Sequence, residues 1–408
     1  MTFIEDITMR KILDSRGSST VEVEIYTTEG FVGAAAAPSG KSTGKHEVMA
    51  FGKKGIDESM RFFHKKVLPE IIGMDTTAQR EVDELLCELD GTDKFEKLSG
   101  NAAVAISLAN AKAAAASLGM PLFKYLGGAM SWETPFPFGN VLGGGAHAIG
   151  GPDIQEFMAV SMGDTVMDSV FANAAVHDRV STLLEKEFPD TAIGKGDEGA
   201  WVAPATNEKA LEIVSQACKD VSKKVKFPIK PALDVASSEF FKKGRYVYKD
   251  RKRDTEEQIQ FIAELVDRFE IHSVEDPLHE DDFKGYSQLT DEIGDKCLVV
   301  GDDLFVTNLE RLEKGIDQGC ANAILIKPNQ IGTLTDTYDT LEFAHHCGYE
   351  TVMSHRSGET PDPVIAHLAV AFGCHGIKTG AVGGERVAKL NELIRIEDEL
   401  FPSFPQHG

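Results

Sequence analysis

Six short apolar runs, each closed by a polar residue and followed by helical periodicity, constrain the fold of this chain most strongly. The runs cover residues 228–234, 272–276, 298–302, 323–327, 350–355 and 376–378. Their closing polar residues follow one another at intervals of 23 to 41 residues, and a strand, a helix and two loops together need about 25 to 30 residues. The longest interval leaves room for a hairpin near 243–248. Serial βα units predict a (β/α)8-type barrel, whose active site lies at the carboxyl ends of its strands.

The N-terminal part of the chain has a different pattern. Residues 20–30 alternate apolar and acidic positions and end in glycine, which predicts a half-buried strand of an antiparallel sheet. Helical spacing follows in two segments, 55–89 and 102–118. The glycine- and proline-containing segment 126–137 is the best candidate for a linker. We therefore expect an α+β capping domain over residues 1–127 and an α/β barrel domain over residues 135–408.

An open doubly wound sheet is the alternative architecture. Such a sheet normally carries a glycine-rich phosphate turn after its first strand. The glycines at 143–145 come closest, but Ala146 and His147 follow them and the GxGxxG spacing is absent. The segment 39–44, here called the lid segment, also lacks the spacing of a phosphate loop and is more typical of a mobile lid. The barrel is the favoured prediction.

Charge and composition argue against several classes of function. The 408 residues carry a formal net charge of −23, which opposes nucleic acid or anionic lipid as the main partner. A local cluster of cations could still hold a small anionic substrate. The N-terminus lacks the apolar run of a signal peptide, and no stretch has the length of a membrane span. The six scattered cysteines are interpreted as reduced core thiols, so we expect a cytoplasmic protein.

Three acidic residues close barrel runs and are the candidate metal ligands. Asp234, Glu275 and Asp302 would meet at one rim, where a hard divalent cation such as Mg²⁺ would offset the cost of holding three carboxylates together. Each one alone is more typical of a helix cap or turn, but their repetition at βα spacing favours a metal site. The neighbouring Asp276 and Asp303 are better interpreted as supporting residues than as ligands.

Two lysines end apolar runs at the same predicted rim. A buried ammonium near a second cation or a metal can have its pKa lowered far enough to serve as a general base. Lys327 and Lys378 are therefore candidate catalytic or binding residues. The alternative is that each forms an interstrand ion pair with one of the carboxylates.

Three loop segments complete the candidate site. The loop 354–360 contains His355, Arg356 and Ser357, whose imidazole, guanidinium and hydroxyl could form an anion pocket. A loop of this polarity is otherwise usually solvated surface. The glycine-flanked Glu198 could donate a proton if confinement raised its pKa, although a surface turn is the simpler reading of that motif alone. The third segment starts at Gly145 and leads through His147 to Glu156.

The same residues resemble one family closely, the enolases. The matching motifs run in order along almost the whole chain: DSRG at 14–17, residues 38–47, GDEG at 196–199, LDVA at 233–236, VEDP at 274–277, residues 301–308, IKPNQIGTL at 326–334, SHRSGET at 354–360 and IKTGA at 377–381. This resemblance implies an α+β capping domain followed by a modified eight-fold barrel. It also implies a lyase of glycolysis and gluconeogenesis that interconverts 2-phospho-D-glycerate with phosphoenolpyruvate and water.

The resemblance further implies a role for each site residue. Asp234, Glu275 and Asp302 would hold the first of two Mg²⁺ ions, and Ser42 on the lid segment would join the second. Lys327 would remove the proton next to the substrate carboxylate. Glu198, helped by Glu156, would donate a proton to the leaving hydroxyl, and His147 and the catalytic His355 would line the pocket. Lys378 would bind the substrate carboxylate, and Arg356 and Ser357 would bind the phosphate.

This chain departs from the usual motifs of the family at a few positions, notably Lys41 beside Ser42 and Trp201 after the GDEG motif. None of these changes removes a proposed catalytic group. The rival readings are another acid dehydratase or racemase of the same superfamily and a non-catalytic binding paralogue. The resemblance implies a homodimer or homo-octamer, and it allows a surface or secreted pool beside the cytoplasmic one.

Overall fold

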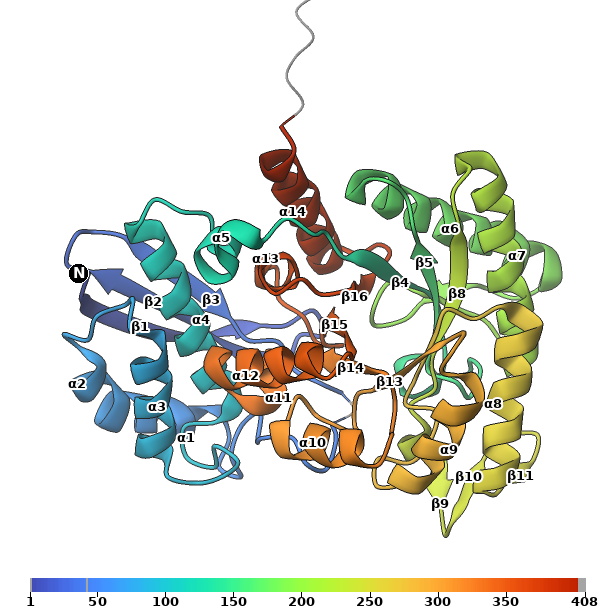
Figure 1. Cartoon of the computed structure of the whole chain (residues 1–408), viewed down its shortest axis with the longest axis horizontal. Coiled ribbons are helices and arrows are strands. Elements are labelled where there is room, and N and C mark those ends of the chain that lie inside the picture. The colour runs from blue at the N-terminus through green and yellow to red at the C-terminus, as the bar shows by residue number, and fades with distance from the viewer. Residues whose placement is uncertain (1, 42, 403–408) are drawn as a thin grey trace, which may run out of the picture.

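The computed structural model of the chain describes residues 2–41 and 43–402. Ser42, predicted to bind the second metal ion, lies outside the described residues. A small N-terminal sheet and its helices lie beside a larger closed barrel (Figure 1).

The N-terminal part contains a three-stranded antiparallel sheet. Its strands are β1 (Ile4–Leu13), β2 (Ser19–Thr27) and β3 (Val32–Ala36), in that spatial order. The helices that follow are α1 (Ile56–Phe62), α2 (Leu68–Ile71), α3 (Gln79–Asp90), α4 (Gly100–Ser117) and α5 (Leu122–Gly127), with a π-helical turn at Phe63–Val67. Val21, Val23 and Ile25 of β2 are fully buried, so the strand predicted from the alternating pattern is confirmed.

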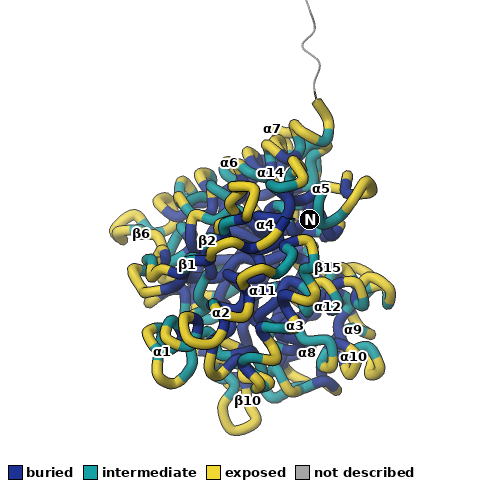
Figure 2. Tube along the Cα trace, turned by 90° about the vertical axis from the view of Figure 1, so that its left-hand side faces the viewer, coloured by how far each residue is buried: buried dark blue, intermediate teal, exposed yellow. Residues whose placement is uncertain are grey.

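Helix α4 joins this sheet to the barrel. Nearly all of its residues are buried, and Figure 2 shows it in the dark blue of buried chain. It contacts β2 and β3 on the sheet and α11 (Pro328–Ile331) on the barrel, and a helix with apolar residues on every face suits such a position. The contact with β3 is so close that a Cβ atom at Gly33 would clash with the carbonyl oxygen of Ala109. Small residues on both elements therefore allow this packing.

Eight strands close the barrel within the described residues. In spatial order they are β4 (Phe136–Gly143), β5 (Glu156–Ser161), β8 (Ile229–Asp234), β12 (Ser273–Glu275), β13 (Leu298–Gly301), β14 (Ala323–Ile326), β15 (Glu350–Ser354) and β16 (Gly376–Gly380), and β16 pairs back to β4. The six predicted runs are β8 and β12 to β16, which are mutually parallel. The predicted fold class is confirmed, and closure excludes the open doubly wound sheet.

The sequence pattern misses the first two barrel strands. β4 begins at Phe136, inside the segment 126–137 that was expected to be a linker, and a 3-10 helix covers Gly128–Met130 of the same segment. β5 runs antiparallel to both of its neighbours, so its first residue lies at the carboxyl ends of the parallel strands. The register pairs Glu156 with Asp234. Reversal of one strand therefore brings Glu156 to the rim where the other predicted site residues lie.

Helices surround the barrel, and six of the eight named here begin with a polar side-chain cap, the exceptions being α13 and α14. The helices are α6 (Val166–Glu187), α7 (Asn207–Val225), α8 (Thr255–Phe269), α9 (Phe283–Ile293), α10 (Leu309–Asp317), α12 (Leu334–His346), α13 (Val364–Ala371) and α14 (Gly384–Leu400). Side chains of Thr165, Thr206 and Thr333 accept backbone N–H groups at the starts of α6, α7 and α12. Short strands form two insertions, β6 (Gly194–Lys195) with β7 (Trp201–Val202), and β9 (Phe241–Lys242) with β10 (Arg245–Val247) and β11 (Lys252–Arg253). The second contains the hairpin predicted near 243–248.

Two buried ion pairs connect the N-terminal part with the barrel. Lys112 of α4 contacts both carboxylate oxygens of Asp362 at 2.8 Å, and Glu47 contacts Arg356 at 3.0 Å. Both acids and Arg356 have side chains that are less than one-tenth exposed. These pairs join segments more than 200 residues apart in the sequence, so they help to fix how the two parts pack.

Two further expectations concern cysteines and membranes. The cysteines are all free, and four are buried, but Cys87 is exposed and Cys347 is intermediate, which corrects the expectation of core positions for these two. Among the described residues, no single helix is long and apolar enough to cross a membrane. Helix α4 and the segment 122–130, which bend by 94° between them, meet the length and composition criteria only as a pair.

Candidate active site

Charged side chains gather at the rim formed by the carboxyl ends of the parallel strands. Asp234 and Glu275 are the last residues of β8 and β12, and Asp302 and Lys327 directly follow β13 and β14. Lys378 lies within β16 and pairs in register with the last residue of β15. Strands of one barrel end at a common rim, so five residues from distant parts of the sequence meet there.

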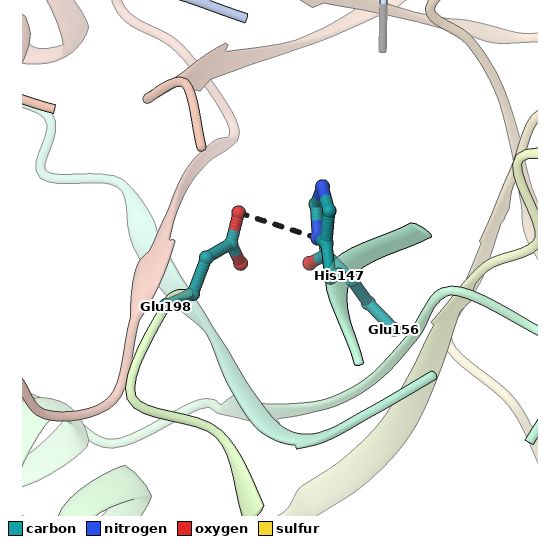
Figure 3. Close-up of side chains that lie close together, drawn as sticks. All are labelled: His147, Glu156 and Glu198. Atoms are coloured by element: carbon teal, nitrogen blue, oxygen red, sulfur yellow. Dashed lines mark ion pairs between the residues drawn. The ribbon is translucent and has the colours of Figure 1, made fainter. Parts of the chain in front are cut away.

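Three further groups reach the site from outside the parallel strands. Glu156 starts the reversed strand β5, and His147 ends a 3-10 turn between β4 and β5. Glu198 lies between β6 and β7, and β7 pairs with β4. The side chains of His147, Glu156 and Glu198 point toward one another (Figure 3), with His147 Nδ1 3.4 Å from Glu156 Oε1 and 3.6 Å from Glu198 Oε1.

A small cavity lies between these groups. It is lined by Gly40, His147, Gln155, Glu156, Glu198, Asp234, Asp302, Lys327, Ser354, His355, Arg356, Ser357 and Lys378. Every predicted site residue except Glu275 and the undescribed Ser42 is on its wall. Buried atoms without a hydrogen-bond partner include His147 Nδ1, Glu156 Oε2 and His355 Nε2. Native proteins rarely leave such atoms unpaired, so the cavity is suited to a polar ligand.

Lys378 is the centre of one ion-pair network. Its Nζ lies 2.9 Å from Asp234, 2.6 Å from Glu275 and 3.4 Å from Glu156. Burial alone would lower the pKa of Lys378, but these carboxylates, led by Asp234, raise it well above the ordinary value. Burial and the charge of Asp234 raise the pKa of Glu275 well above its ordinary value. The rim therefore holds more negative charge than one ammonium compensates.

Lys327 forms a separate pair with Asp302. The Lys327 ammonium donates to Asp302 Oδ2. Burial raises the pKa of Asp302, but the charge of Lys327 outweighs it and lowers that pKa below the usual range. Conversely, burial would lower the pKa of Lys327, and the Asp302 carboxylate raises it. In this arrangement Lys327 is protonated. It can act as a base only if another cation takes the place of its ammonium group beside Asp302.

The pKa values of Glu156 and Glu198 are shifted in opposite directions. Burial and the neighbouring Glu198 raise the pKa of Glu156. Burial alone would also raise the pKa of Glu198, but His355 and His147 lower it well below its usual value. Asn140 donates to Glu198 Oε2 at 3.0 Å. The arrangement can therefore hold one proton between two carboxyl groups whose environments differ.

Arg386 fixes the protonation of His355. The guanidinium of this fully buried residue donates to His355 Nδ1 at 2.8 Å and to the carbonyl oxygens of Arg356 and Ser357 at 2.6 and 2.8 Å. Because Nδ1 accepts this bond, the proton of the neutral ring lies on Nε2, 3.4 Å from Glu198 Oε1. Burial lowers the pKa of His355 to about 4, so the ring is neutral near pH 7.

Asp276, which follows β12, supports the turn after β13. Asp276 accepts the backbone N–H groups of Asp302 and Asp303 at 2.9 and 2.8 Å and the hydroxyl of Tyr286 at 3.0 Å. These bonds hold the turn that presents Asp302 to the cavity.

The rim carboxylates offer ligands for a metal ion. Ligand atoms lie within 4.8 Å of one another in two groups, one of His147, Glu156 and Glu198 and one of Asp276, Asp302 and Asp303. The predicted set does not form such a compact group among the described residues, because Asp234 and Glu275 face Lys378 whereas Asp302 faces Lys327. Its donors are nevertheless all carboxylate oxygens, which Mg²⁺ prefers, and Glu275 Oε1 is buried without a partner. These residues therefore fit a hard cation.

Sequence reasoning missed several residues that support the site. Glu47 contacts Arg356, and Gln330 donates to Asp302 Oδ1 at 2.9 Å. Asn140 and Arg386, described above, were also missed. Arg386 had a detectable signal, because it lies on the same face of α14 as the buried leucines, and a charge on an apolar face usually has a specific partner. Glu47 and Gln330 lie within the quoted motifs 38–47 and 326–334, but their local sequence does not indicate their partners, and Asn140 had no signal.

The two unusual residues near the site have contacts of their own. Lys41 Nζ lies 3.0 Å from Asp197, beside Glu198, and the Lys41 backbone N–H donates to Ser357 Oγ at 2.9 Å. Trp201 stacks on His177 of α6 with ring centroids 5.0 Å apart and donates Nε1–H to its carbonyl oxygen at 2.9 Å. Trp201 therefore anchors the loop that carries Glu198 to a barrel helix.

Comparison with known proteins agrees with this arrangement. The family model "Enolase, N-terminal domain" matches residues 4–126, and "Enolase, C-terminal TIM barrel domain" matches residues 131–408. A protein named Enolase from Methanothermobacter thermautotrophicus is 52% identical over 405 residues, which cover 98% of this chain and 97% of the relative. Proteins of the same name from Methanosphaera stadtmanae and Halorubrum lacusprofundi are 51% and 50% identical, and the matches cover 97% and 98% of this chain and 97% and 100% of the relatives.

Proposed function

The chain belongs to the enolase family, and from this premise we propose how its residues divide the work of the reaction. Enolases are phosphopyruvate hydratases, and this chain is a lyase of that kind, acting in glycolysis and gluconeogenesis. It interconverts 2-phospho-D-glycerate with phosphoenolpyruvate and water. The observation that best supports the division of roles is the single cavity lined by Lys327, Glu198, Arg356 and two of the three metal carboxylates.

The family depends on Mg²⁺, and the rim carboxylates would hold it. We assign the first ion to Asp234, Glu275 and Asp302, and a second to the lid segment with Ser42. A bound cation supplies the positive charge that stabilises the doubly charged carboxylate formed on proton removal, and it lowers the pKa of a neighbouring ammonium. The count of two ions is part of the proposal.

Lys327 is the proposed base. Its amine takes the proton from the carbon next to the substrate carboxylate, and the electron pair left behind first delocalises into that carboxylate. The pair forms the new carbon–carbon double bond in a second step, when the hydroxyl departs. Lys378, buried among three carboxylates, binds the substrate carboxylate. Both lysines lie on the cavity wall, so one holds the group whose charge increases and the other removes the proton.

Glu198 and Glu156 form the proposed acid. The proton favoured on Glu156 by burial and by its neighbour can pass to the departing hydroxyl through Glu198, so that water leaves. His147 lies between the two carboxyl groups, and the Nε2–H of His355 faces Glu198. The imidazoles therefore keep the donor oriented toward the cavity.

Arg356 and Ser357 are the proposed phosphate-binding residues. Both line the cavity, and a guanidinium with a neighbouring hydroxyl suits a phosphate group. Arg386 holds the backbone of both residues. The phosphate would thus be bound by a segment whose backbone Arg386 holds in place.

Proton exchange tests the two roles separately. Lys327→Ala should lose both dehydration and exchange of the substrate α-proton with deuterated water, measured by NMR. Glu198→Gln should retain exchange while losing dehydration by about 10²-fold or more. Exchange retained in Lys327→Ala, in a protein that melts like the wild type, would contradict the assignment of the base.

Three broader expectations remain proposals. We place the domain boundary between residues 127 and 135, a range that includes the gap at 127–130 between the matches of the two family models. We propose a homodimer or homo-octamer, since Met167 and Phe171 of α6 expose large apolar side chains, and light scattering would test it. A cytoplasmic location follows from the place of the reaction in glycolysis.

A further inference from the structure

Glu47 is a buried carboxylate of the N-terminal part that reaches the barrel. It lies between β3 and α1 and is 9% exposed. Its Oε2 accepts from Arg356 Nη2 at 3.0 Å, and Oε1 lies 3.2 Å from the same nitrogen. The same Oε1 accepts the backbone N–H of Gly44 at 3.0 Å and Gln330 Nε2 at 3.3 Å. One carboxylate thus binds a residue of the lid segment and two side chains of the barrel.

The barrel partners of Glu47 lead directly into the site. Arg356 lines the cavity and donates Nη1–H to Asn329 Oδ1 at 2.8 Å. Gln330 donates to Asp302 Oδ1 at 2.9 Å, so a single amide separates Glu47 from a proposed metal carboxylate. An ionised acceptor forms stronger hydrogen bonds than a neutral one. Glu47 can therefore restrict the orientation of the Arg356 guanidinium.

The described part of the lid segment contacts the barrel loop 354–360. Ser39 and Gly358 exchange two backbone hydrogen bonds of 2.7 and 2.8 Å, and Asn329 donates to the carbonyl oxygen of Pro38 at 3.1 Å. Because Gly44 and Arg356 share one carboxylate, the position of the lid segment and the orientation of the guanidinium depend on each other.

We infer that Glu47 is a positioning residue of the phosphate subsite, which orients Arg356 toward the substrate phosphate when the lid segment is docked. The inference rests on the proposed function, because it takes Arg356 as the phosphate-binding residue. It adds to that function a residue from the N-terminal part that never needs to touch the substrate.

The charge of Glu47 provides a way to separate positioning from simple electrostatics. A negative charge beside Arg356 weakens the attraction of the subsite for phosphate. If this effect dominated, removal of the carboxylate would tighten phosphate binding. If positioning dominates, removal leaves the guanidinium poorly oriented and weakens binding. The two explanations therefore predict opposite changes in KM.

The test compares Glu47→Ala and Glu47→Gln with the wild type. We expect Glu47→Ala to raise KM for 2-phosphoglycerate and the inhibition constant of inorganic phosphate by about tenfold or more, with a smaller change in kcat. Glu47→Gln keeps the side-chain length and one acceptor oxygen, so it should recover part of the loss. Lys112→Met is the matched control, because it breaks the other buried ion pair between the two parts without touching the cavity.

Three results would overturn the inference. They are an unchanged or lower KM in both Glu47 variants, a rise in KM of the same size in Lys112→Met, and no recovery in a folded Glu47→Gln. The rise in Tm caused by inorganic phosphate provides a readout that does not need turnover. Its loss in Glu47→Ala, with partial retention in Glu47→Gln and full retention in Lys112→Met, supports the inference even if 2-phosphoglycerate is not converted, an outcome in which the proposed function alone would fail.

Discussion

Asp362→Asn should destabilise the protein by removing the charge that joins α4 to the barrel. Asp362 accepts Lys112 Nζ with both oxygens at 2.8 Å and the backbone N–H groups of Ala36 and Val364 at 3.0 Å. Breaking a buried pair by removing one partner costs about 3–5 kcal/mol. The Lys112 side chain is 20% exposed and keeps the carbonyl oxygen of Ala34 as an acceptor, so we expect about 3 kcal/mol, near the lower limit.

This loss should depend on pH in a defined direction. Burial alone would raise the pKa of Asp362, but Lys112 and the backbone donors lower it below its usual value. A lowered folded-state pKa gives stability that is complete above the unfolded-state pKa of about 3.9 and is lost as pH falls through the folded-state pKa. The difference between wild type and Asp362→Asn should therefore be constant from about pH 5 to 8 and shrink below about pH 4.

Urea unfolding followed by circular dichroism measures this difference directly. At about 2.1 cal/mol/K per residue, 3 kcal/mol corresponds to a decrease in Tm of roughly 3–4 °C for a chain of this length if it unfolds as one unit. A difference below about 0.5 kcal/mol at pH 7 would show that the pair contributes little. A difference that stays constant down to pH 3 would show that it does not arise from the charge of Asp362.

Three further predictions concern the site. Arg386→Met removes the donor to His355 Nδ1 and should lower kcat about tenfold while shifting the nitrogen NMR signals of the ring; unchanged signals would contradict the assigned tautomer. Lys41→Ala breaks an ion pair with Asp197 that is partly exposed on both sides, so kcat/KM should change by less than about fivefold and the change should vanish at high salt; a larger effect that persists in salt would give Lys41 a direct role. Removal of divalent ions with EDTA should abolish turnover and, relative to Mg²⁺ at about 100 times its Kd, remove about 2.7 kcal/mol of stability, or roughly 3 °C of Tm; an unchanged Tm would indicate that the rim does not bind Mg²⁺.

The sequence predicts the parallel part of the barrel well because each of those strands is a short apolar run that ends in a polar residue. β4 and β5 escape prediction for different reasons. β4 begins among the glycines and prolines of the segment 126–137, which locally resemble a linker. β5 is apolar but reversed, and the direction in which a strand pairs leaves no mark on its own sequence. Strand direction is decided by the sheet as a whole.

The site divides in a similar way between predictable and unpredictable residues. Asp234, Glu275 and Lys327 are detectable because each one ends or directly follows a strand, and strand ends converge. Glu47 and Gln330 lie outside such positions, and nothing in their local sequence indicates which side chain they contact. The proposed metal ligands show a second limit of prediction from sequence. Chemistry predicts that carboxylates would bind the ion, but the ion pairs of Asp234 and Glu275 with Lys378 depend on side-chain packing in the folded chain.

Formation of phosphoenolpyruvate from 2-phosphoglycerate, followed by ultraviolet absorbance, tests the central claim most directly. The wild-type protein with Mg²⁺ should form the product, and the EDTA-treated protein and Lys327→Ala should both fail to do so while remaining folded. A folded, metal-loaded wild-type protein that forms no product would contradict the account, and so would full activity in Lys327→Ala.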